Sequence, residues 1–167
     1  SYDLVYRPMN GEDNITYSVP YGTAATDMPT PEDPVRIGYT FAGWYLGDEA
    51  YTFGTMPANN VELTAHWDVN TYKIVFVDSA DTSIVYDTLE QAYGTNIVTP
   101  NNPSKVGYTF AGWDRDVPET MPASDVTLVS QWNENDADYT AYNAAVAAAQ
   151  AKQAEAGYDK TYTAESS

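Results

Sequence analysis

A single histidine, His66, limits the proton-transfer chemistry that this chain could carry out. A serine triad would need His66 as its general base, and the sequence contains no Gly-x-Ser-x-Gly nucleophile elbow. His66 falls on the polar side of an alternating segment, where an imidazole is ordinarily solvated, and the matching position in a second copy of that segment is Gln131. The surroundings of His66 therefore indicate no catalytic site.

Paired acids offer a second kind of chemistry, because Asp48 with Glu49, or Asp114 with Asp116, could act as the acid and base of a glycoside hydrolase. The chain has 24 acidic residues in 167, so neighbouring acids arise by chance. The two pairs are consistent with a solvated surface, and we expect no enzyme activity.

Metal and crosslinking sites are also weakly indicated. The segments "NGEDN" (10–14) and "DSAD" (78–81) carry oxygen ligands, but neither has the 12-residue spacing of a calcium loop, which leaves only weak adventitious calcium binding. No glycine-rich phosphate loop is present. Lys73 could form an isopeptide crosslink, but the sequence identifies no buried carboxyl to catalyse it. We therefore expect no cofactor and no built metal site.

Composition argues against several further classes of function and of site. With 24 acids against 7 Lys and Arg, the net charge of −17 repels nucleic acid and anionic lipid. The absence of cysteine excludes disulfides, thiolate metal sites and cysteine nucleophiles. No apolar run reaches the roughly 20 residues that span a bilayer. Because the chain starts at "SYDLVY" without Met, we expect a monomeric piece of a longer multidomain protein, whose leader and anchor lie outside it.

Two aromatic segments each occur twice in the chain. "GYTFAGW" occurs at 38–44 and again at 107–113, an offset of 107 − 38 = 69. "MPANNVELTAHW" (56–67) matches "MPASDVTLVSQW" (121–132), an offset of 121 − 56 = 65, so the second copy is four residues shorter between these blocks. "YGT" also occurs twice upstream, at 21–23 and 93–95. The sequence therefore predicts one structural unit made in two copies.

Alternation of apolar and polar residues predicts strands within each copy. Val61, Leu63, Ala65 and Trp67 should share one face, as should their counterparts Val126, Leu128, Ser130 and Trp132. Further strands are predicted at 3–6, 14–19, 72–77 and 82–88. Since hairpins connect these segments, each copy should form a small antiparallel sheet of about four strands.

The repeated rings have two interpretations. Small domains without disulfides need large buried side chains, so the rings are expected to fill two small cores. The rings concerned are Tyr39, Phe41, Trp44 and Trp67 with their counterparts Tyr108, Phe110, Trp113 and Trp132. An exposed ligand platform is the alternative.

The alanine-rich tail predicts a helix over 138–156. Asp136 or Asp138 would serve as its N-cap and Gly157 would follow its last turn. Tyr139, Tyr142, Val146 and Ala149 form one stripe, which should pack on the second copy, a symmetry mate or a missing helix.

The paired blocks "GYTFAGW" and "MPANNVELTAHW" resemble the Listeria–Bacteroides repeat, also called the internalin B-repeat, over about residues 2–133. The resemblance implies a β-grasp-like domain with a mixed sheet, found in tandem arrays that act as stalks or weak adhesive modules on bacterial surface proteins. It supplies no catalytic residue. The tail resembles the first half of the "found in various architectures" helical module.

The resulting prediction is a mainly β protein with two tandem small β-grasp-like domains, 1–69 and 70–135, and a truncated helical module at 136–167. Its expected function is that of a non-enzymatic extracellular stalk or spacer for adhesion at the bacterial cell surface. The alternative is a module that binds a glycan or a host protein through exposed rings such as Tyr45 or Tyr51, which have no equivalents in the second copy.

Overall fold

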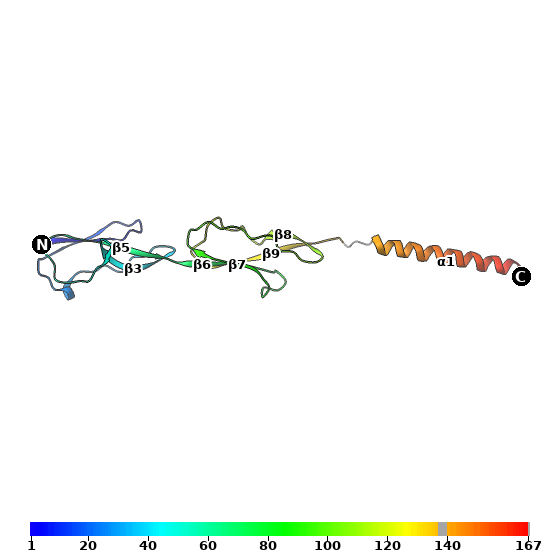
Figure 1. The fold of residues 1–167 in the computed structure, drawn as a ribbon, viewed down its shortest axis with the longest axis horizontal. Helices are drawn as coiled ribbons and strands as arrows, with labels where there is room; N and C mark the ends of the chain where they lie inside the picture. Colours follow the sequence, from blue (N-terminus) through cyan, green and yellow to red (C-terminus); the bar gives the residue numbers. More distant parts are fainter. Residues whose placement is uncertain (137–139, 167) are drawn as a thin grey trace. The chain divides into compact units, whose positions relative to one another are not determined.

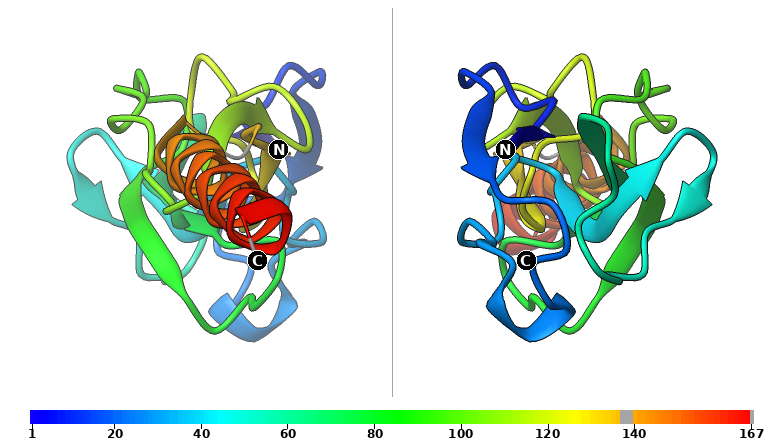
Figure 2. Two further views of the ribbon diagram at one scale, coloured as in Figure 1. Left: turned by 90° about the vertical axis from the view of Figure 1, so that its right-hand side faces the viewer. Right: turned by 90° about the vertical axis from the view of Figure 1, so that its left-hand side faces the viewer.

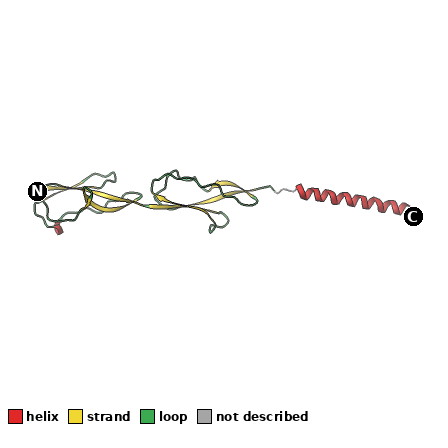
Figure 3. Ribbon diagram, in the orientation of Figure 1, coloured by secondary structure: helices red, strands yellow, loops and turns green. Residues whose placement is uncertain are grey.

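A computed structural model describes residues 1–136 and 140–166, and it shows two β-sheets and one C-terminal helix (Figure 1). Figure 2 gives two further views and Figure 3 separates strands, helix and loops. The elements are β1 (Tyr2–Arg7), β2 (Ile15–Val19), a 3-10 turn (Ala25–Asp27), β3 (Tyr39–Leu46), β4 (Glu49–Ala50), β5 (Val61–Val69), β6 (Thr71–Val77), β7 (Val85–Ala92), β8 (Tyr108–Trp113), β9 (Val126–Glu134) and α1 (Thr140–Ser166). The predicted mainly β class is confirmed.

Contacts divide the chain into two compact units, residues 1–102 with 112–131, and residues 103–111 with 132–167.

The first sheet has the strand order β2-β1-β5-β3-β4. Strand β1 lies antiparallel to β2, with Leu4 opposite Tyr17, and parallel to β5, with Leu4 opposite Val61. Strand β5 pairs antiparallel with β3, where Phe41 is opposite Trp67. Strands β1 and β5, which are far apart in the sequence, therefore lie side by side and run in the same direction.

The second sheet repeats this arrangement in the order β7-β6-β9-β8. Ile74 of β6 is opposite Leu89 of antiparallel β7 and opposite Val126 of parallel β9. The expectation of all-antiparallel sheets is therefore wrong in both copies, and the mixed sheet implied by the family resemblance is present. Alternation shows which side chains share a face, but it does not identify the neighbouring strand or its direction.

The predicted faces are confirmed on both long strands. Val61, Leu63 and Ala65 of β5 are buried, and Trp67 on the same face is half-buried. In β9, Leu128 and Ser130 are buried while Val126 and Trp132 are half-buried.

The first core forms around Tyr6, which is fully buried. Its ring meets Trp44 edge to face at 4.8 Å between centroids, and its hydroxyl donates a hydrogen bond to the Pro29 carbonyl at 2.8 Å. Burial raises the pKa of Tyr6 far above its ordinary value, and the nearby phenols of Tyr17 and Tyr51 raise it further. The buried members of this core are Leu4, Tyr6, Val19, Met28, Met56, Val61 and Leu63.

The second core is built in the same way around Phe76, which meets Trp113 edge to face at 4.9 Å. Its buried members are Ile74, Phe76, Met121 and Leu128. Phe76 with Trp113 therefore occupies the place that Tyr6 with Trp44 holds in the first core.

A backbone clamp on one methionine explains the "YGT" and "MPA" landmarks. Met56 accepts from the Gly22 N–H at 2.9 Å and donates to the Thr23 carbonyl at 2.9 Å. In the second copy, Met121 accepts from Gly94 and donates to Thr95 at 2.9 and 2.8 Å. Each clamp holds a buried methionine side chain over its core.

The interpretation of the repeated rings as core is confirmed for Trp44 and Trp113, which pack against the two cores. Phe41 with Trp67, and Phe110 with Trp132, instead form half-buried edge-to-face pairs at 5.6 and 5.5 Å outside the core clusters.

Tyr39 and Tyr108 also lie outside the cores. The Arg36 guanidinium lies 4.1 Å from the centroid of the Tyr39 ring, and the Lys105 ammonium lies 5.3 Å from that of Tyr108. These two rings bind a neighbouring cation rather than fill an interior.

A close contact surrounds Gly38 within the unit that contains residues 1–102. The Tyr93 ring packs over Gly38 and meets Tyr39 edge to face at 5.8 Å. The Asn70 N–H donates to the Gly38 carbonyl at 2.9 Å, and the Asn70 carbonyl accepts from Tyr93 at 2.8 Å. Asn70 thus links the backbone of Gly38 to that of Tyr93, whose ring covers the glycine.

Helix α1 is longer than the predicted 138–156, because it continues through Gly157 to Ser166. An interior glycine costs a helix only about 1 kcal/mol relative to alanine, which by itself does not end it. Asp138 and Tyr139 lie outside the described residues. The side chains of 141–154 are all exposed, so the stripe through Tyr142 is not buried there. Among the described residues, no helix has both the length and the apolar character to cross a bilayer.

Candidate binding groove

The structure places His66 against an aromatic ring. The imidazole is half-buried and stacks on Tyr45 with ring centroids 3.7 Å apart and an interplanar angle of 4°. Asp48 and Glu49 are exposed at the tip of the β3–β4 hairpin. This arrangement packs His66 as part of the sheet surface.

Asp114 serves the second sheet structurally. Its carboxylate accepts a hydrogen bond from the Val129 N–H at 2.8 Å, and its own N–H donates to the Val129 carbonyl at 2.8 Å. The bond from Val129, together with the Arg115 guanidinium at 3.4 Å, holds the pKa of Asp114 below its ordinary value. Asp116 is exposed.

The first predicted oxygen-ligand loop is closed by its own side chains. Asn10 accepts from the Glu12 N–H at 3.0 Å, and its amide donates to the Glu12 carboxylate at 2.9 Å and to the Val35 carbonyl at 3.0 Å. Such a turn orders the loop without a cation.

The second such loop centres on Asp78, which is buried and accepts hydrogen bonds from the Ala80 N–H and from the Tyr86 hydroxyl. Lys73 is exposed, with its ammonium 3.5 Å from the Glu90 carboxylate. Within residues 1–136 and 140–166, no group of three His, Cys, Asp or Glu could hold a metal ion.

Tyr45 and Tyr51, the rings predicted to bind a ligand, are both half-buried. Tyr51 meets Phe53 edge to face at 5.0 Å and packs against the first core. Their role in ligand binding stays a prediction.

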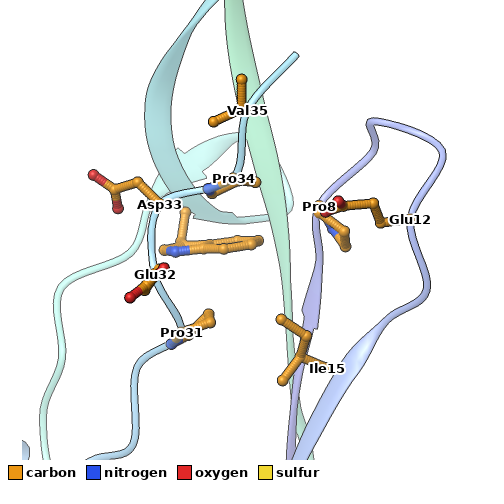
Figure 4. A pocket seen from close by; sticks show the side chains of 9 residues that line it. Pro8, Glu12, Ile15, Pro31, Glu32, Asp33, Pro34 and Val35 are labelled. Carbon is orange, nitrogen blue, oxygen red and sulfur yellow. The ribbon is translucent and has the colours of Figure 1, made fainter.

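A groove of about 290 Å³ opens on the first sheet beside Trp44 (Figure 4). Figure 4 shows one wall made by the segment from Pro31 to Val35 and the other by Pro8, Glu12 and Ile15. The lining residues are Pro8, Glu12, Ile15, Pro31, Glu32, Asp33, Pro34, Val35 and Trp44. The groove joins residues of three separate segments of the first copy.

A β-bulge positions Trp44. The register of β3 against β5 shifts between Phe41 and Gly43, where Gly43 has a φ of +119°. The extra residue brings Phe41 and Trp44 to the same side of the strand, where their rings meet at 5.3 Å. The second glycine of the heptapeptide is therefore required by the bulge.

Hydrogen bonds from buried or ring donors hold both walls. The Tyr6 hydroxyl binds the Pro29 carbonyl at the start of one wall, and the Trp67 indole N–H donates to the Pro8 carbonyl on the other at 2.9 Å. The Asn10 side-chain amide donates a hydrogen bond to the Val35 carbonyl on the opposite wall. These three hydrogen bonds fix the backbone on both sides of the groove.

The groove is acidic. Glu12, Glu32 and Asp33 line it, and all three are exposed to solvent. Neither basic residue of the first copy lines it: Arg7 pairs with Glu62 at 3.0 Å, and Arg36 lies over Tyr39. The lining therefore carries three carboxylates and no basic residue.

The second sheet differs at the corresponding place. Tyr86 lies 6.4 Å from Trp113, ring to ring, and donates its hydroxyl hydrogen to Asp78. Asn101 and Asn102 replace the acids Glu32 and Asp33 in the loop that precedes the heptapeptide. The second copy therefore sets an additional ring beside its tryptophan and lacks the two loop carboxylates.

Sequence reasoning missed this groove. The sequence places Glu12 in a candidate calcium-binding loop, and no role was predicted for 30–34. The available signal was the difference between "TPEDP" and "TPNNP" in two otherwise matching copies.

Comparison with known proteins matches residues 2–66 and 72–131 to the model of the Listeria-Bacteroides repeat domain. A "Putative Gly-rich membrane protein" of Evansella cellulosilytica is 30% identical over 80% of this chain and 16% of its own length. Internalin H of Listeria monocytogenes is 35% identical over 64% of this chain and 21% of its own length. The chain therefore spans about a fifth or less of these two relatives.

A solved structure of streptococcal high identity repeats in tandem, domains 3–4 from a cell surface protein, covers 82% of this chain and 100% of that one. Its identity is 16% and its TM-score 0.29, a level at which the two folds cannot be equated.

Proposed function

Because the chain belongs to the Listeria-Bacteroides repeat domain family, in two tandem copies, we propose that it is a structural repeat region of a bacterial cell-surface protein. In this role it acts as a stalk that holds an adhesive part of the parent protein away from the cell wall. It is non-enzymatic and extracellular, a monomeric section of a longer multidomain chain, and residues 1–69, 70–135 and 136–167 are its domains.

One observation carries this proposal: the two copies repeat their interiors and vary their surfaces. The contact of Tyr6 with Trp44 at 4.8 Å returns as that of Phe76 with Trp113 at 4.9 Å. On the surface, by contrast, Gln131 replaces His66. A ligand site shared by both copies would instead repeat its exposed positions.

The test replaces this region in the parent protein. Deletion of 1–135 should reduce adhesion by cells that display the protein, and two unrelated folded domains of similar length should restore it. A stalk acts through its length, so the replaced sequence does not matter. Failure of the unrelated domains to restore adhesion, while the wild-type repeats do so, would contradict the stalk role.

A second candidate function is favoured by the groove beside Trp44. In this reading the first copy binds a host protein or a glycan, with Tyr45 and Tyr51 as further candidate contacts. A screen of glycans and host proteins against the wild-type chain and Tyr45→Ala would test it. Micromolar binding that Tyr45→Ala abolishes would support the binding role over a pure stalk.

A further inference from the structure

We propose that the groove beside Trp44 binds the cationic side chain of a lysine or arginine from a partner polypeptide. The inference rests on the binding role proposed above and names its ligand class.

Charge complementarity is the first argument. Glu12 and Glu32 line opposite walls of the groove, and Asp33 adds a third carboxylate at its rim. In Figure 4 the Asp33 carboxylate points away from the opposite wall, whereas the Glu12 carboxylate points toward it. The two basic residues of the first copy are engaged at Glu62 and Tyr39, so neither supplies a cation to the groove.

Hydrogen-bonding capacity is the second argument. Pro8, Pro31 and Pro34 have no backbone N–H, and carboxylates only accept hydrogen bonds. The lining is therefore rich in acceptors. Guanidinium and ammonium groups only donate, and they suit this lining better than the hydroxyls of a saccharide, which need both donors and acceptors.

The apolar part of the lining supplies the third argument. The methylene stem of lysine or arginine packs on apolar surface while its charged end stays at the rim, and the prolines with Ile15 offer such a surface. Tryptophan is also the most favourable ring for a cation above its face. Trp44 is half-buried and lines the groove.

The second copy is a natural contrast. It keeps the tryptophan as Trp113 but has Asn101 and Asn102 in the loop and the Tyr86 ring beside the indole. The proposal therefore predicts binding at the first copy and not at the second.

The experiment titrates the ¹⁵N-labelled full chain with a peptide of alternating Gly and Arg and follows the indole N–H signals of Trp44 and Trp113. A peptide with neutral citrulline in place of arginine is the ligand control. We expect the arginine peptide to shift the Trp44 signal and leave Trp113 unchanged, with the citrulline peptide at least about tenfold weaker. Higher salt should weaken binding because the carboxylates are exposed.

Two matched double variants test which carboxylates attract the arginine peptide. Glu32→Asn with Asp33→Asn copies the second-copy loop and should weaken binding about three- to tenfold. Asp48→Asn with Glu49→Gln removes the same charge from the exposed β3–β4 hairpin and should change the dissociation constant by less than about twofold. Equal weakening by both pairs would mean nonspecific attraction to the net charge and would overturn the proposal.

Two further outcomes would also overturn it. One is a Trp44 signal that the arginine peptide leaves unchanged. The other is a Trp44 signal that responds to an N-acetylglucosamine oligosaccharide with no effect of the charge variants. Either result leaves the stalk role intact, because that role is tested by domain replacement on cells.

Discussion

The ring of Tyr93 occupies the space into which a side chain on Gly38 would project. A Cβ built on Gly38 would lie less than 3.0 Å from three ring carbons of Tyr93. The corresponding glycine of the second copy, Gly107, has nothing within 4 Å of the same position. Both have a left-handed backbone, with φ of +79° and +82°. Substitutions at Gly38 and Gly107 therefore distinguish the effect of backbone strain, which both share, from that of steric contact, which only Gly38 has.

Gly38→Ala should therefore destabilise the protein more than Gly107→Ala. Both variants place alanine in the left-handed region at a cost of about 1–2 kcal/mol, and only Gly38→Ala adds an overlap of about 1–3 kcal/mol. Denaturant unfolding followed by tryptophan fluorescence measures the difference. In a Tyr93→Ala background the excess cost of Gly38→Ala should shrink, and an unchanged excess would contradict the steric explanation.

The two clamped methionines should contribute equally to their cores. Met56→Ala and Met121→Ala each remove a fully buried side chain and should lower the free energy of unfolding by about 2–5 kcal/mol. Met9, which is 55% exposed, is the control, and Met9→Ala should change stability by less than about 0.5 kcal/mol. Losses at Met56 and Met121 no larger than at Met9 would show that the cores are not packed as described.

Tyr6 should make the first repeat sensitive to alkali. Its pKa is raised in the folded state, so its contribution is complete below the ordinary value of 10.0 and is lost as pH rises above it. Tyr6→Phe should lower stability at neutral pH by about 1–3 kcal/mol, because the Pro29 carbonyl loses its donor, and should flatten the decline above pH 10. Unfolding curves at a series of pH values test this, and an equally steep decline in Tyr6→Phe would contradict it.

Asp114 should act at the opposite end of the pH scale. Its pKa is lowered in the folded state, so its contribution is present above the ordinary value of 3.8 and is lost as pH falls through the folded value. Asp114→Asn should reduce the acid dependence of stability, whereas Asp116→Asn, at an exposed neighbour, should not. Identical acid profiles for the wild type and Asp114→Asn would exclude this role.

Much of the fold follows from local sequence pattern. The alternation from Val61 to Trp67 correctly identified a half-buried strand, and the repeated blocks correctly indicated two copies of one unit. Pairing was not predictable in this way, because the parallel contact of Leu4 with Val61 joins residues that are far apart in the chain. The length of α1 was also missed, because one glycine weakens a helix by only about 1 kcal/mol and does not by itself end it.

The groove was harder to predict than the sheets. It depends on the bulge at Gly43, which turns Trp44 to the same side as Phe41, and no alternation pattern anticipates an inserted residue. It also needs Pro8 and Pro31 on facing walls, which only the folded chain brings together.

The parallel contact of β1 with β5, repeated by β6 with β9, has a mechanical consequence. Tension along the chain enters the first sheet at the start of β1 and leaves at the end of β5, so it pulls these neighbours lengthwise in opposite directions. The hydrogen bonds between β1 and β5 are then loaded in shear, so all of them resist the force at once and they do not break one after another. Each sheet is therefore arranged to resist stretching along the chain.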